Sequence, residues 1–224
     1  MKKIILLCTL VFGITLFSDA QPILADETTS TGAAITFTGD NTDPTSPVDP
    51  TNPDNPGTNP GTGMGGPLSL DYVPSMAFGT QTISGNVETY NLIDLKPYIQ
   101  VTDKRGTGTG WKVSVSLSAF ENDDASNSFD GVITFKNAQT ATTTGNTSPS
   151  PSAANPVVIT SGAGEQILVT TTAAKQGMGT WVTRWFASDT NQTTNDSVLL
   201  TLNTANVSAD SYTADLNWII SNAP

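Results

Sequence analysis

Strict alternation of apolar and polar residues marks two stretches of the chain, one near its middle and one at its end. In residues 106–120 the apolar alternate positions include Trp111 and Val113. In residues 212–220 they include Trp218 and Ile220. Successive side chains of a strand point to opposite faces, so both stretches are predicted to be strands with one buried face.

Short apolar runs rich in Val, Ile, Thr and aromatic residues recur through residues 68–224, separated by clusters of Gly, Asn, Ser and Asp. Their spacing lacks the 3.6-residue period of a helix and is typical of an all-β fold. We predict a single antiparallel β-sandwich domain with Greek-key-like connections. The expected strands are 68–72, 75–78, 88–95, 97–102, 110–120, 131–136, 156–160, 165–171, 181–187, 197–203 and 211–221. The long gap at 137–155 is expected to be a surface loop or a poorly ordered insertion.

Residues 1–25 have the pattern of a secretory signal peptide. Lys2 and Lys3 precede an apolar run that is shorter than the ~20 residues of a membrane span. Cleavage after Ala20 fits the small-residue rule, whereas cleavage after Ala25 leaves an acidic start, and both stay open. We therefore expect an exported protein with no transmembrane anchor in its mature chain.

Residues 26–67 differ in composition from the rest. Seven prolines between positions 44 and 67 alternate with Thr, Asn, Asp and Gly, and large apolar residues almost vanish. Such a segment buries too little surface to offset its ordering entropy. It is expected to be a disordered, acidic spacer in front of the domain at 68–224.

Charge and residue inventory exclude several functions. The chain has 9 basic and 20 acidic residues, a net charge of −11, which disfavours a nucleic-acid partner. It has no histidine, and its one cysteine, Cys8, lies in the apolar leader. Ser-His-Asp and thiol catalysis are therefore ruled out, and no metal site or cofactor is expected.

Paired carboxylates are the enzymatic chemistry that remains. Glu121, Asp123, Asp124 and Asp130 form an acidic cluster in a polar stretch. A glycan-processing enzyme needs two such groups across a cleft, one of them with a raised pKa. A run of neighbouring acids in a turn is more typical of a solvated loop, and the chain is not expected to be an enzyme.

The four tryptophans allow two interpretations. Trp111 has apolar Val113 two residues after it, and Trp218 has apolar neighbours two residues away on each side, which favours core packing. Trp181 and Trp185 share a strand face with Thr183 and Ala187 and are better candidates for exposed rings that contact a sugar or a partner.

Several spaced motifs resemble the WxL-domain surface proteins of Gram-positive bacteria. The matching pieces are LSLDYVP at 68–74 with FG at 78–79, YIQVTD at 98–103, GWKV at 110–113 and YTADLNWIISNAP at 212–224. Where the family name specifies leucine, this chain has Val113 and Ile220, aliphatic replacements of similar volume that should preserve packing.

The resemblance implies a secreted protein held non-covalently at the cell wall, a binding or scaffolding protein with peptidoglycan as ligand. Other cell-surface proteins would be further partners. It makes the motif positions candidate ligand-binding residues, to which the ring-exposure argument adds two more: Trp111, Val113, Trp218, Ile220, Trp181 and Trp185. A protein–protein interaction module without direct wall binding and a carboxylate-dependent glycan-processing enzyme remain the alternatives.

Overall fold

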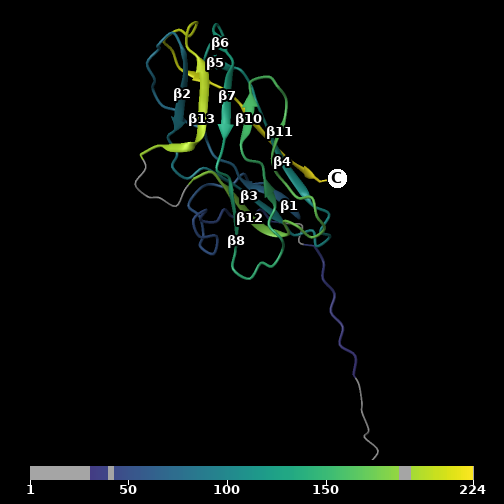
Figure 1. Cartoon of the computed structure of the whole chain (residues 1–224). Coiled ribbons are helices and arrows are strands. Elements are labelled where there is room, and N and C mark those ends of the chain that lie inside the picture. Colours follow the sequence, from purple (N-terminus) through teal and green to yellow (C-terminus); the bar gives the residue numbers. More distant parts are fainter. Residues whose placement is uncertain (1–30, 40–42, 187–192, 224) are drawn as a thin grey trace, which may run out of the picture. The chain divides into compact units, whose positions relative to one another are not determined.

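The strands of the computed structural model are antiparallel and run through residues 68–222 (Figure 1). The structure describes residues 31–39, 43–186 and 193–223, so the predicted signal peptide lies outside the described residues. The strands are β1 (Leu68–Tyr72), β2 (Val87–Leu92), β3 (Tyr98–Asp103), β4 (Trp111–Leu117), β5 (Phe120–Asn122), β6 (Ser128–Phe129), β7 (Gly131–Phe135), β8 (Gln139–Thr142), β9 (Ser152–Ala153), β10 (Val157–Thr160), β11 (Gln166–Thr170), β12 (Gly179–Arg184), β13 (Asn195–Asn203), β14 (Tyr212–Thr213) and β15 (Leu216–Asn222).

These strands form four sheets, and the predicted all-β antiparallel class is confirmed. Three sheets have four strands each, in the orders β1-β3-β12-β8, β10-β7-β13-β2 and β15-β4-β11-β9. A smaller sheet joins β14, β5 and β6. Figure 1 shows β2, β13, β7 and β10 side by side, in an order that the chain does not follow.

One apolar core joins the four sheets. Alternate residues of β4 and β7 point into it, including Val113 and Val115, which have 0% exposure. Phe135 on β7 meets Trp185 edge to face, with ring centroids 4.8 Å apart. Each sheet thus buries one face against the others, as expected for short strands with period-two patterning.

The gap at 137–155 was predicted to be a loop or a poorly ordered insertion, and that prediction is wrong. It contains β8, which pairs with β12, and β9, which pairs with β11. Its Thr- and Ala-rich sequence carries little intrinsic strand signal, and the pairing is decided by its neighbours in the sheet. Residues 75–78, expected to be a strand, have no regular structure, although Phe78 packs against the core.

Each of the two long alternating stretches forms two strands instead of one, and the two interruptions lie side by side. Residues 110–120 divide into β4 and β5, and residues 211–221 divide into β14 and β15. At the break the Ser118 N–H donates to the Asp215 carbonyl at 3.0 Å, and the Asp215 N–H donates to Ser118 Oγ at 2.8 Å. The two segments therefore pass side by side from the sheet of β4 and β15 to the sheet of β5 and β14. Their apolar faces stay on the core.

Residues 43–62, which we call the strap, are packed on the domain. The strap turns back on itself through a bridge between Val48 and Pro56. Its Val48 N–H donates to Gln100 Oε1 at 2.7 Å, and the Tyr98 hydroxyl donates to the Val48 carbonyl at 3.1 Å. Arg184 Nη1 donates to the Pro50 carbonyl at 2.8 Å. The prediction of a disordered spacer over all of 26–67 is therefore wrong for the strap.

The strap covers the sheet face that turns away from the core. On that face Tyr72 and Tyr98 stack with ring centroids 4.3 Å apart, beside the fully buried Val182 and the strap's Val48. Strand β3 is buried along its whole length because both of its faces are covered. Proline gives up little conformational freedom on folding, so a proline-rich segment can be held with few apolar contacts.

Candidate functional site

The two tryptophan-bearing motifs lie on neighbouring strands. Strand β15 pairs with β4 in an unbroken antiparallel register. Ile220 is opposite Val113, Trp218 is opposite Val115, and Asn222 is opposite Trp111. The two tryptophans are therefore not direct partners but lie at different levels of the same strand pair.

Three of the four tryptophan rings are buried, so the structure gives them no surface for a ligand. Trp111 is 1% exposed, and its Nε1–H donates to the Gly177 carbonyl at 2.9 Å. The predicted exposure of Trp181 and Trp185 is wrong, since both lie in the core. Their face of β12 is the one that packs on the core, whereas the opposite face, which carries Val182, is covered by the strap.

The second motif is less deeply placed. Trp218 and Ile220 are half-buried against the core, and the Trp218 ring meets Phe135 edge to face at 6.3 Å. Val113, by contrast, is fully buried. Of the six candidate residues from the sequence, only these two retain surface.

An arginine joins the ends of the motif strands to β3. Arg105 donates from Nε and Nη2 to the two carboxylate oxygens of Asp103, at 2.9 and 2.8 Å. The third guanidinium nitrogen, Nη1, donates to Asn222 Oδ1 at 2.6 Å, and Nη2 also donates to the Gly110 carbonyl at 2.7 Å. The hydrogen bonds to Asp103 raise the pKa of Arg105, so the guanidinium stays charged.

The acidic cluster has the properties of a solvated turn. Asp123 and Asp124 are exposed, and Ser126 donates to Asp124 Oδ1 from both its N–H and its hydroxyl. These hydrogen bonds lower the pKa of Asp124, whereas a general acid needs a raised pKa. Within the described ranges, no group of three or more acidic, histidine or cysteine side chains is arranged to hold a metal ion.

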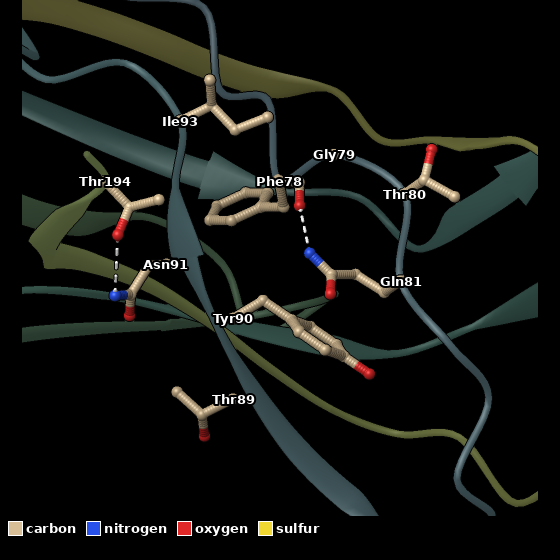
Figure 2. A pocket seen from close by; sticks show the side chains of 9 residues that line it. All are labelled: Phe78, Gly79, Thr80, Gln81, Thr89, Tyr90, Asn91, Ile93 and Thr194. Atoms are coloured by element: carbon tan, nitrogen blue, oxygen red, sulfur yellow. Dashed lines mark hydrogen bonds between the residues drawn. The ribbon is translucent and has the colours of Figure 1, made fainter.

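A surface hollow of about 510 Å³, which we call the β2 hollow, lies beside strand β2 (Figure 2). Its wall comes from strand β2, the loops on either side of β2 and the residue just before β13. The lining residues are Phe78, Gly79, Thr80, Gln81, Thr89, Tyr90, Asn91, Ile93 and Thr194. The β2 hollow thus combines two aromatic rings with hydroxyl and amide groups and contains no carboxylate, amine or guanidinium.

Local contacts hold the loop that closes the β2 hollow. Gln81 reaches back and donates from Nε2 to the Phe78 carbonyl at 2.6 Å (Figure 2). The Ile93 N–H donates to the Ala77 carbonyl at 2.9 Å. Gly79 has φ of 72°, and a Cβ there would meet Ile93 Cδ1 at 3.0 Å, so this turn requires glycine.

The β2 hollow also joins distant parts of the sequence. Asn91 Nδ2 donates to Thr194 Oγ1 at 3.3 Å, so the residue just before β13 forms one side of the hollow. Sequence reasoning identified the strand but missed the site. The only local indication of the site in the sequence is a tyrosine between Thr89 and Asn91. The other lining residues are brought beside it only by folding.

A second hollow of about 610 Å³ lies between the strap and residues 93–96. Asp49, Asp94 and Lys96 line it, and it contains no aromatic ring. The β2 hollow is the better candidate for a neutral ligand, because its groups can bind without desolvating a charge.

Comparison with known proteins identifies a family over nearly the whole chain. A family model described as "WxL domain surface cell wall-binding" matches residues 25–224. The chain matches no curated protein and no solved structure. Within the part of the chain that the structure describes, no helix has the length and apolar character needed to cross a membrane.

Proposed function

Because the chain belongs to the WxL family of surface cell wall-binding domains, we propose that it attaches non-covalently to the wall and that the β2 hollow binds a sugar of peptidoglycan. The composition of the hollow carries this proposal, since Phe78 and Tyr90 lie among uncharged hydroxyl and amide groups. The family is one of binding domains, and we assign no reaction to the chain.

A sugar ring has an apolar C–H face and a rim of hydroxyl groups. An aromatic side chain offers a large, rigid apolar surface to such a face. The amides of Gln81 and Asn91 each offer two donors and one acceptor oxygen, and each spends one donor on the protein. The remaining groups can bond to sugar hydroxyls and fix the orientation of the ring.

Charge supports a neutral ligand. The chain carries a net charge of −11, so polyanions of the wall repel it at a distance. A neutral sugar in an uncharged hollow avoids that repulsion. The same charge makes binding to anionic polymers weaker at low salt than at high salt.

The predicted export signal and the family support a protein that acts outside the cell, at the wall, and other cell-surface proteins are proposed as further partners. In this proposal Trp111 and Val113 support the domain without contacting the ligand. The half-buried Trp218 and Ile220 serve the same role at the edge of the sheet.

A sedimentation assay on purified, protein-free peptidoglycan tests the proposal. We expect the chain from residue 26 onward to pellet with the wall, and Tyr90→Ala to lose at least about tenfold in affinity, or ~1.4 kcal/mol. Gln81→Ala and Asn91→Ala, which change exposed side chains, should each lose several-fold without lowering the melting temperature.

Asn206→Ala is the matched control, an exposed amide outside the β2 hollow. It should pellet like the unmodified chain. If all three β2-hollow variants pellet normally, the hollow is not the site. If the unmodified chain ignores protein-free peptidoglycan but binds walls that retain their proteins, the interaction-module alternative is favoured.

A further inference from the structure

Strand β15 ends its sheet, and no other described strand pairs with its outer side. In an antiparallel pair, residues alternate between those that bond across to the partner and those that point away from it. The bonds from Ser118 N–H to Asp215 and from Ala223 N–H to Gly110 set this phase. The backbone N–H and C=O groups of Trp218 and Ile220 therefore point away from β4, toward the free edge.

Other edge strands carry features that prevent further pairing. Strand β1 has a register irregularity at Asp71, and Thr62 of the strap donates to the carbonyls of Leu70 and Asp71. Strand β2 carries the charged Glu88, and its register with β13 is shifted at residues 195–199. The edge strands β8, β9 and β10 have only two to four residues.

Strand β15 has none of these features. Its seven residues, LNWIISN, include no charge and no proline, and its register with β4 is regular throughout. Exposed edges of this kind are templates for another strand, and proteins ordinarily guard them. The half-exposed Trp218 and Ile220 are also apolar side chains that one more strand would cover.

The chain itself contains a strand-like segment without a partner strand. Residues 33–38, AAITFT, alternate apolar and threonine positions from Ile35 onward and are exposed, with no regular secondary structure. Ile35 is 76% exposed and Phe37 is 84% exposed. In a strand these two positions would share one face, and exposed apolar side chains of this kind are typical of a segment that pairs on association.

We propose that residues 33–38 of one copy add as a strand to the free edge of β15 in a second copy. Six residues in a strand span ~20 Å, which is close to the length of β15. Ile35 and Phe37 would cover Trp218 and Ile220, while Thr36 would lie beside Ile219 on the opposite face. The donor segment and β15 are both uncharged, so the pairing itself adds no repulsion to a chain of net charge −11.

Such pairing joins unlike surfaces of the two copies and can continue from copy to copy. It is independent of the β2 hollow, and its test does not depend on wall binding. Cross-linking is clean because Cys8, the one cysteine, lies before residue 26. Chains from residue 26 onward carrying Thr36→Cys are mixed with chains carrying Ile219→Cys and oxidised.

We expect a disulfide-linked heterodimer from this mixture. The matched control replaces Ile219→Cys with Thr160→Cys, an exposed position on the edge strand β10, and should give background cross-linking only. Equal yields from the two mixtures would overturn the proposal.

Light scattering over a concentration series gives a second test. The unmodified chain should shift toward higher mass with concentration, and Phe37→Asp and Ile219→Lys should each shift the association midpoint at least tenfold upward. Val158→Lys, an exposed aliphatic on β10, is the control and should associate normally. A chain that stays monomeric at every concentration, or association that survives Phe37→Asp, would overturn the assignment of residues 33–38.

Discussion

Ile220 lies directly opposite Val113 across the antiparallel pair of β15 and β4. These are the two positions at which the chain has a different aliphatic residue from the leucine of the family name. Each replacement faces the other, so the pair is one packing unit formed by two separate motifs. The alternation of hydrogen bonds makes it a non-hydrogen-bonded pair, in which side chains approach most closely.

A double-mutant cycle measures this relationship. We expect Val113→Ala and Ile220→Ala to couple by about 0.5–1 kcal/mol in the free energy of unfolding, because each removes the other's contact. Val113→Ala with Ile219→Ala is the control, since Ile219 is on the opposite face, and should be additive. Additivity of both pairs in urea unfolding would show that the two positions do not pack together.

The tryptophans differ in depth, and their contributions should differ too. Trp111→Ala is expected to cost about 3–5 kcal/mol, as for a large core truncation, because the ring is buried and its N–H is bonded. Trp218→Ala, which truncates a half-buried ring, should cost less, about 2 kcal/mol. Urea unfolding followed by circular dichroism checks both, and an inverted order would contradict the burial difference.

We expect Arg105 to contribute more to the free energy of unfolding than its partly exposed position suggests. The Asp103 side chain is 1% exposed, so Arg105→Ala leaves a buried carboxylate without its partner and should cost about 3 kcal/mol. Asn222→Ala removes only one neighbouring hydrogen bond and should cost about 1 kcal/mol. Adding Asp103→Asn to Arg105→Ala should recover part of the loss, and no recovery would show that the ion pair is not the cause.

Removal of the strap should destabilise the domain. A chain that begins at residue 63 exposes the face formed by Tyr72, Tyr98 and Val182, which we expect to cost at least about 3 kcal/mol, or ~10 °C in melting temperature. A chain that begins at residue 43 retains the strap and is the matched control. Equal melting temperatures of the two chains would show that the strap contributes no stability.

Asp71 gives the stability a pH dependence of known sign. Burial raises the pKa of Asp71 above its ordinary value of 3.8, against the opposing effect of hydrogen bonds from Ser69, Thr102 and Gln100. The native state then holds the proton more tightly than the unfolded chain. This contribution is complete below pH 3.8 and is lost as pH rises through the raised pKa.

Melting temperatures between about pH 3 and pH 8 test this for the unmodified chain and Asp71→Asn. As pH rises, the unmodified chain should lose stability relative to the variant, which has no proton to release. The control is Asp196→Asn, which removes an exposed carboxyl. Parallel profiles for the unmodified chain and Asp71→Asn would contradict the role of burial.

Local patterning determined the strands that carry the core. Alternation around Trp111 and Trp218 identified both motif strands and the face that each one buries, because period two is a property of the strand itself. The residue inventory likewise determined which chemistry the chain lacks, since no fold can supply a histidine. The motif pieces were enough to identify the family, because their residues and spacing are written along the chain.

Tertiary structure alone decided what covers the strands and which surfaces remain. The composition of the strap predicts disorder, yet the strap packs because Tyr98 and Val182 form an apolar face that its Val48 covers. That cover buries the sheet of Trp181 on both sides, which local alternation cannot reveal. The β2 hollow and the free edge of β15 arise in the same way, since each depends on which distant strands become neighbours and which do not.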